Sequence, residues 1–300
     1  MFTVMDRISR PGHPAKPNED ICGVSGDWAW VIDTSIFPGT SPVMHRTSDA
    51  TWLATFADER LSNLAPHAQD GVALLRHVME EARTAYRAVA PRERHDDFIT
   101  WPLGAMTLVR RGGDVLDAWT FGDTTAYVRQ PDGSVATLGD APGLRDAESA
   151  KAAELIGQAG SRPTAILDES VFLAWLGERR ERQRKSGIPA ALLSFNPDAV
   201  GRLRHETAPC PDGTTILLAS DGFSALVDLY RAMDATALMD AALSSGLDPL
   251  VTLAREIETE RDPDGRLFPR FKASDDATAI LLRPLPTGRP PRPGPPRCAA

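Results

Sequence analysis

The stretch TTILLASDGF, residues 214–223, has the pattern of a buried strand followed directly by an acidic turn. Its apolar run, 214–219, is bounded by Asp212-Gly213 before it and Asp221-Gly222 after it. This is the pattern of a strand buried inside a sheet. The pattern predicts that Asp221 lies at the end of that strand, and other acidic residues occupy similar places along the chain.

Three further acidic positions flank predicted strands. Glu19-Asp20 comes directly before an apolar run, Asp33 ends the strand that starts at Trp28, and Asp275-Asp276 opens the last strand. Because the start of one antiparallel strand lies beside the end of the next, all four positions can gather at one edge of a sheet. A single Asp at a strand end is more often only a turn residue, so the prediction depends on the four together.

Crowded carboxylates beside an apolar core repel one another and lose hydration, and a divalent cation offsets both costs. Oxygen ligands without His or Cys favour hard ions such as Mg²⁺ or Mn²⁺. Two such ions can share a bridging water and use it to attack a phosphoryl group. The acidic pattern therefore predicts a two-metal hydrolytic site.

The other elements predict an α+β protein, in which helices cover antiparallel strands. Residues 1–18 read as a polar lead-in, and four short strands separated by turn signals read as a β-meander. The predicted helices are 48–64, 70–89, 146–158, 169–183, 232–244 and 249–258, and the predicted meander and final strands are 105–110, 115–121, 125–129, 135–138 and 278–282.

Composition narrows the class of protein. The net charge of −8 and the absence of a basic patch argue against nucleic acid as a partner. No apolar stretch approaches the roughly 20 residues of a membrane helix, so we expect no membrane partner. Three cysteines without paired spacing favour a cytoplasmic location. Residues 284–300 are rich in Pro and are expected to form a disordered tail.

Six motifs in order resemble the PPM, or type 2C, metal-dependent serine/threonine protein phosphatases, in particular bacterial members. The resemblance covers 18–283, nearly the whole chain without its tail. Its most specific pieces are Ala219-Ser220-Asp221-Gly222 and Gly122-Asp123-Thr124; the others are Asn18-Glu19-Asp20, Trp30-Val31-Ile32-Asp33-Thr34, Gly104-Ala105-Met106-Thr107-Leu108 and Ser274-Asp275-Asp276-Ala277-Thr278.

The resemblance implies a four-layer α-β-β-α sandwich of two antiparallel sheets flanked by helices. The catalytic domain would span 1–283, with 141–210 as a variable flap or insert that influences substrate choice. Phosphorylated proteins would be the substrates. Phosphoserine and phosphothreonine would be hydrolysed by direct attack of a hydroxide bound to two Mg²⁺ or Mn²⁺ ions, without a phospho-enzyme.

The resemblance also implies individual roles. Asp33 bridges the two metals, and Asp221 and Asp275 hold the first. Asp20 and Glu19 serve the second, with the backbone carbonyl of Thr34 as a further ligand. Asp123 matches the position that helps to bind a third, weaker metal.

Departures from the family pattern motivate an alternative, a catalytically weak or inactive phosphatase-fold protein that acts as a binding or regulatory module. Thr34 replaces the Gly after Asp33, and it would be strained if the turn needs a positive φ. Asp276 replaces an Asn, which leaves Asp275 and Asp276 both open as the ligand. The phosphate-binding Arg is not aligned, and Lys16 and Arg10 are its nearest substitutes, with Lys16 the predicted phosphate ligand.

Overall fold

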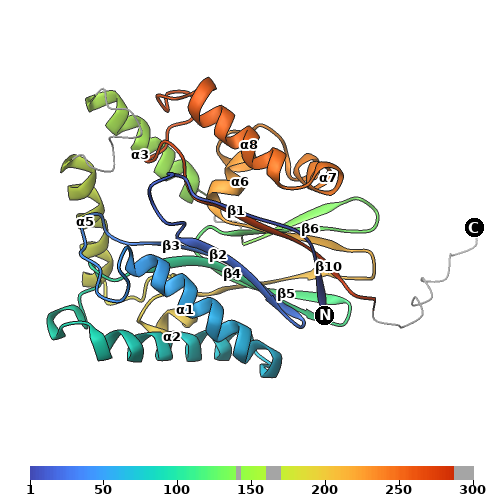
Figure 1. Cartoon of the computed structure of the whole chain (residues 1–300), viewed down its shortest axis with the longest axis horizontal. Coiled ribbons are helices and arrows are strands. Elements are labelled where there is room, and N and C mark those ends of the chain that lie inside the picture. The colour runs from blue at the N-terminus through green and yellow to red at the C-terminus, as the bar shows by residue number, and fades with distance from the viewer. Residues whose placement is uncertain (140–142, 160–169, 287–300) are drawn as a thin grey trace, which may run out of the picture.

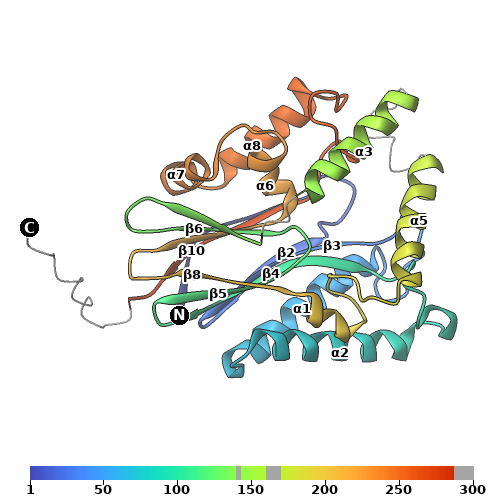
Figure 2. The same cartoon turned by 180° about the vertical axis from the view of Figure 1, so that it is seen from behind.

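Two five-stranded antiparallel sheets lie face to face in the computed structural model, which describes residues 1–139, 143–159 and 170–286. Helices α1 and α2 cover the outer face of one sheet, and α6, α7 and α8 cover the outer face of the other (Figures 1 and 2). This arrangement confirms the predicted four-layer α-β-β-α sandwich.

The two sheets draw their strands from both halves of the chain. Sheet A has the order β1-β10-β9-β6-β7, formed by β1 (Phe2–Arg10), β10 (Ala277–Pro284), β9 (Thr215–Ala219), β6 (Thr125–Arg129) and β7 (Val135–Leu138). Sheet B has the order β2-β3-β4-β5-β8, formed by β2 (Asp20–Ser25), β3 (Trp28–Ser35), β4 (Leu103–Gly112), β5 (Val115–Phe121) and β8 (Arg204–Pro209).

The helices begin where the sequence supplies caps. Ser48 accepts a hydrogen bond from the amide of Ala50, and Asp70 accepts from those of Val72 and Ala73, which satisfies free N–H groups of the first turns. The α-helices are α1 (Asp49–Leu64), α2 (Gly71–Val89), α3 (Leu144–Ala159), α5 (Ser170–Lys185), α6 (Asp221–Asp228), α7 (Ala235–Ser245) and α8 (Asp248–Glu256). Short helical turns are η1 (Ala65–His67), η2 (Arg92–Arg94), η3 (Pro197–Arg202) and η4 (Ile257–Arg261).

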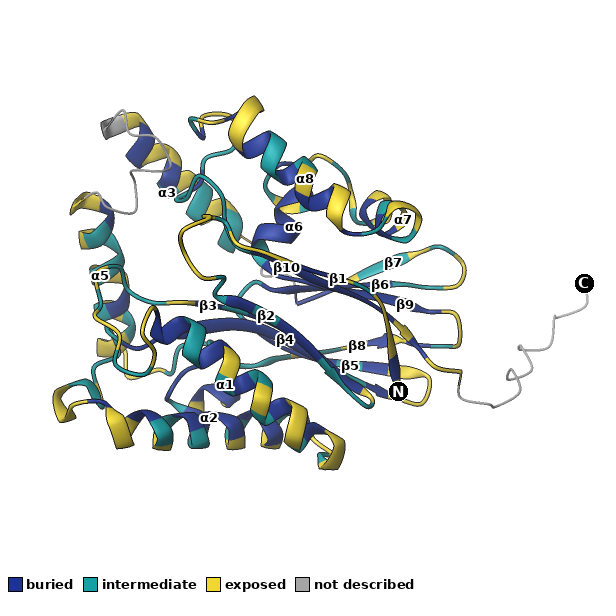
Figure 3. Ribbon diagram, in the orientation of Figure 1, coloured by how far each residue is buried: buried dark blue, intermediate teal, exposed yellow. Residues whose placement is uncertain are grey.

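Buried residues, dark blue in Figure 3, form three apolar layers against the faces of the two sheets. One layer, around Trp30 and Met79, lies between sheet B and helices α1 and α2. A second, around Val31 and Leu218, fills the space between the two sheets. The third, around Phe223, lies between sheet A and helices α6 to α8. Strand β9 is buried on both faces, as its continuous apolar run predicts.

The predicted β-meander is wrong in its pairing. Strands β4 and β5 pair in sheet B, and β6 and β7 pair in sheet A. The chain therefore leaves one sheet for the other between β5 and β6. Gly122 lies at this crossing with a φ of +70°, a backbone conformation that residues with a Cβ atom rarely adopt.

Four further elements correct the sequence interpretation. The polar lead-in contains β1, which pairs with β10 along the edge of sheet A. Helix α6 begins directly at Asp221, and β8 lies within the predicted insert although it pairs with β5 in sheet B. The predicted tail overlaps β10 at Pro284, and residues 287–300 lie outside the described residues.

The six predicted helices are present, within a few residues of their expected limits, as α1, α2, α3, α5, α7 and α8. Residue 169, the predicted start of one of them, lies outside the described residues. In the described part of the chain, every helix is too short or too polar to cross a bilayer.

Candidate functional site

Sheet B contributes two of the predicted site residues as a cross-strand pair. Asp20 begins β2 and Asp33 lies near the end of β3, and the antiparallel register places them directly opposite each other. Directly opposed residues project to the same face, where like charges repel. The hairpin therefore concentrates negative charge at one end of sheet B.

Sheet A contributes the other pair from β9 and β10. Asp221 follows β9 and Asp275 precedes β10, and these strands are antiparallel neighbours. The amide of Ser220 donates to the carbonyl of Thr278, which extends the ladder to this end. Gly222 permits the close approach, since a Cβ at this residue would lie 2.0 Å from the carbonyl oxygen of Asp276.

The two pairs meet at one end of the sandwich. The charges of Asp221 and Asp275 act on both Asp20 and Asp33, and the carboxyl groups of Asp33 and Asp221 contact each other. The prediction that the acids converge is confirmed, but their expected location on one sheet edge is wrong. Each sheet supplies one pair, because the strands that carry them belong to different sheets.

Burial raises the pKa of Asp20 and of Asp33 well above the usual range. The neighbouring carboxylates raise both further, and a hydrogen bond from Ser220 opposes the effect at Asp20. Burial raises the pKa of Asp123 to about 7, with the charge of Asp221 adding to the effect and that of Arg145 opposing it.

Asp221 behaves differently. Burial acts against its ionised form, but Arg145, the contact with Asp33 and the charge of Lys272 together lower its pKa. Its position in the first turn of α6 also favours negative charge.

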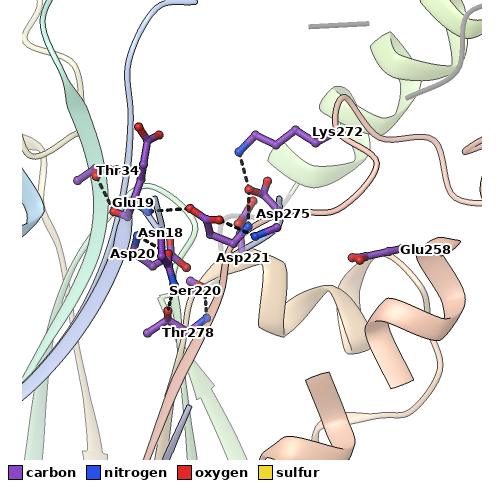
Figure 4. Close-up of polar contacts among 12 residues, drawn as sticks. Asn18, Glu19, Asp20, Thr34, Ser220, Asp221, Glu258, Lys272, Asp275 and Thr278 are labelled. Carbon is purple, nitrogen blue, oxygen red and sulfur yellow. Dashed lines mark hydrogen bonds and ion pairs between the residues drawn. The ribbon is translucent and has the colours of Figure 1, made fainter. Parts of the chain in front are cut away.

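Two cations that the sequence pattern did not indicate contact the carboxylates of the sheet A pair. The Nζ of Lys272 pairs with Asp275 Oδ1 at 2.5 Å, as Figure 4 shows. Arg145, near the start of α3, places Nη1 3.4 Å from Asp221 Oδ2 and Nε 3.3 Å from Asp228 Oδ1. The spacing of Lys272 three residues before Asp275 was the available sequence signal for the first of them.

Within the ranges that the structure describes, the remaining predicted residues have other partners or none of the aspartates in direct contact. The side chain of Glu19 accepts a hydrogen bond from the hydroxyl of Ser48. Asp123 follows the Gly122 crossing, whose carbonyl accepts from Arg204 at 2.6 Å. Lys16 lies in the turn before β2 with an exposed side chain.

Thr34 stays within β3 instead of entering a strained turn. In the described part of the chain, Arg231 alone among non-glycine residues has a positive φ. The Thr34 hydroxyl donates to the carbonyls of Glu19, at 2.6 Å, and Ala50, at 2.9 Å. Thr34 thus ties the Glu19 segment to helix α1, which a Gly at this position could not do.

Asp276 is engaged by the backbone. Its two carboxylate oxygens accept from the amides of Gly12 and Glu19, each at 2.7 Å. Asp275 instead directs its carboxylate to Lys272 and the amide of Asp276. These contacts favour Asp275 as the residue available to a ligand and give Asp276 a structural role.

The oxygen-only donors of this cluster fit the chemistry of a hard divalent ion. Asp20 is only 7% exposed, and its buried Oδ2 has no hydrogen-bond partner. Asp221 Oδ1 also has no donor unless it shares a proton with Asp33. Yet no three acidic, His or Cys side chains of the described residues are arranged to hold one ion. The carboxylates are directed toward one another and toward Lys272 and Arg145.

Comparisons with solved structures identify proteins of the same architecture. PstP, a serine/threonine protein phosphatase whose catalytic domain was solved with 2 manganese ions, matches with a TM-score of 0.50 and 13% identity, over 94% of this chain and 97% of its own. The PPM Ser-Thr phosphatase MsPP from Mycobacterium smegmatis, solved with cacodylate, matches with a TM-score of 0.50 and 20% identity, over 94% and 99%.

The serine/threonine phosphatase Stp1 from Staphylococcus aureus matches with a TM-score of 0.55 and 12% identity, over 94% of this chain and 96% of its own. No protein-family model matches the sequence, and a search of curated proteins gives no match. The likeness therefore lies in the backbone architecture, which extends over almost the whole chain. The chain has the fold of the bacterial PPM serine/threonine phosphatases.

Proposed function

We propose that this protein is a metal-dependent phosphatase that hydrolyses phosphoserine and phosphothreonine in proteins. One observation carries the proposal: four aspartates from two sheets converge at one end of a PPM fold, and Asp20 holds a buried carboxylate oxygen without a partner. A chain that folds at the cost of this repulsion needs a compensating cation.

The proposed ligands follow the sequence predictions. Asp33, which faces the acids of both sheets, would help to hold both of two Mg²⁺ or Mn²⁺ ions, and Asp221 and Asp275 would help to hold one of them. Asp20, Glu19 and the carbonyl of Thr34 would serve the other, and Asp123 would serve a third. Such ions, when bound, make water nucleophilic near neutral pH and neutralise charge on the phosphoryl group.

The residues of the chain prepare the site for that chemistry. Asp33 and Asp221 can hold one proton between their carboxyl groups, and this proton must leave before both can serve as ligands. Asp276 fixes the Glu19 backbone against the start of β10. Lys16, three residues before Glu19 on an exposed turn, is the proposed cation for the substrate phosphate.

A second function, binding without turnover, is favoured by one specific observation. Lys272 and Arg145 already neutralise part of the acidic cluster. A chain that balances its own carboxylates in this way needs less external metal. Such a protein would act as a binding or regulatory module.

A phosphatase assay separates the two functions. We expect hydrolysis of a phosphothreonine peptide that requires Mn²⁺ or Mg²⁺ and stops with a chelator. The Asp33→Asn and Asp221→Asn variants serve as site controls. Turnover that both variants retain would exclude the proposed site, and no turnover by the unaltered chain with either metal would favour the binding module.

A further inference from the structure

Lys272 lies at the point toward which the proposed ligands of one ion converge. Its Nζ pairs with Asp275 Oδ1, and the charges of Asp33 and Asp221 act on it as well. In Figure 4 its side chain extends toward Asp275 from the loop before β10. A lysine ammonium is a compact point charge, so it can neutralise carboxylates at the same place as a metal ion.

The backbone just before Lys272 is held in place by ring packing and by an ion pair. The preceding residue, Phe271, packs at a tilt against Phe172 and Trp175 of α5, with ring centroids 5.0 and 5.3 Å away. Arg270 is buried and pairs with Asp262 at 2.9 Å. These contacts fix the backbone at the base of the lysine, so its direction toward the cluster is a feature of the packed structure.

The side chain of Lys272 is also partly exposed to solvent. Its side chain is 42% exposed, which lets the ammonium swing into water while the anchored backbone stays in place. A tethered cation with this freedom can be displaced by a divalent ion of higher charge. Displacement costs the lysine its pairing with Asp275, and this cost lowers the apparent affinity for the ion.

We propose that Lys272 is a built-in counter-ion that competes with divalent metal for Asp275 and Asp221. The inference rests on the proposed metal-dependent function and adds a determinant of metal affinity to it. Divalent metal then binds weakly at the sheet A carboxylates, which already have ion pairs with Lys272 and Arg145. It binds more tightly at Asp20 and Asp33, which have no ion pair with a Lys or Arg of the described residues.

Calorimetric titration of Mn²⁺ into the metal-free full chain tests the proposal. Lys272→Met removes the charge and keeps much of the apolar stem, and Lys272→Arg keeps the charge. Lys185→Met is the matched control, because Lys185 pairs with Glu181 at the end of α5. We expect Lys272→Met to tighten the weaker Mn²⁺ site by about tenfold, while Lys272→Arg and Lys185→Met bind as the unaltered chain does.

A second measurement is thermal unfolding of the same proteins. Lys272→Met should melt at a lower temperature than the unaltered chain in chelator and should gain more stability from added Mn²⁺. Equal Mn²⁺ affinity and stoichiometry in the unaltered chain and Lys272→Met would overturn the counter-ion role and leave the proposed function standing. Binding only by Lys272→Met would support the counter-ion and contradict metal dependence of the natural chain. Binding by neither protein would overturn both.

Discussion

The two aspartate pairs occupy similar positions in the two sheets but differ in their charge partners. Asp20 of sheet B is buried and Asp33 is half-buried, and the charges that act on both are chiefly those of other carboxylates. Asp221 and Asp275 of sheet A have ion pairs with Arg145 and Lys272. Burial and repulsion raise the pKa of both sheet B acids. In sheet A, burial also raises the pKa of Asp275 although Lys272 opposes it, and the cations help to lower only the pKa of Asp221.

This difference indicates which carboxylates an external cation would stabilise most. Neutralising an isolated buried carboxylate relieves desolvation and repulsion together, whereas a carboxylate already paired has less to gain. We therefore expect the free energy of metal binding to come mainly from the sheet B pair. The sheet A pair would contribute position and a second, weaker site.

The largest expected effect is on catalysis. Asp33→Asn should lower Mn²⁺-dependent turnover by about 10³-fold, because it removes the proposed bridge and several kcal/mol of charge stabilisation. Asp275→Asn should cost less, about tenfold to hundredfold, since Lys272 already neutralises part of that charge. Steady-state rates on a phosphothreonine peptide measure both.

Asp132→Asn, in the exposed turn between β6 and β7, is the control for this comparison and should leave turnover unchanged. An equal loss in Asp33→Asn and Asp275→Asn would show that the two sheets contribute alike.

The next effect is on the stability of the metal-free chain. Asp221→Asn should lower the free energy of unfolding by about 2 kcal/mol, because it leaves the guanidinium of Arg145 with Asp228 as its remaining carboxylate partner. Urea unfolding in chelator measures the change. Arg145→Met in the Asp221→Asn background should restore part of the lost stability. An Asp221→Asn variant as stable as the unaltered chain would contradict the pairing of Asp221 with Arg145.

Asp20→Asn should act in the opposite direction. It removes a buried charge beside other acids, so the metal-free chain should gain about 1 kcal/mol at pH 8. The same variant should gain less stability than the unaltered chain when Mn²⁺ is added. Chemical unfolding with and without Mn²⁺ checks both expectations, and a destabilised metal-free Asp20→Asn would remove the basis for the contrast between the sheets.

Much of this architecture could be predicted from local pattern. The apolar run that becomes β9, the capped helices α1 and α2, and the acids at strand ends all depend on residues close in sequence. Strand pairing does not, because the same alternating pattern suits either sheet. This is why four consecutive strands read as one meander although β5 and β6 lie in different sheets.

The cations of the site were harder to predict than its acids. A carboxylate at the end of a buried strand has a position fixed by that strand. Lys272 reaches the cluster from an irregular loop, and Arg145 from a helix of the insert. Their side chains are long, and their targets depend on how these segments pack against the sheets, which the sequence pattern does not specify.

The smallest expected effect tests whether the insert supports only one half of the site. Phe172 of α5 packs against Phe271, which lies beside Lys272. Among the described residues, neither ring is paired with an aromatic ring of the β2–β3 hairpin. Phe172→Leu removes an aromatic contact of about 0.5–1.5 kcal/mol. Backbone amides in 268–276 should then exchange hydrogen about fivefold faster, while those in 19–35 keep their protection.

Phe56→Leu is the matched control, because Phe56 packs on Trp52 of α1 with ring centroids 5.2 Å apart and lies in the layer behind sheet B. Hydrogen exchange followed by mass spectrometry compares the two variants. Equal acceleration of both segments in Phe172→Leu would mean that the insert holds the two aspartate pairs as one unit. Acceleration confined to 268–276 would mean that the sheet A pair, with its tethered lysine, can loosen while the sheet B pair stays rigid.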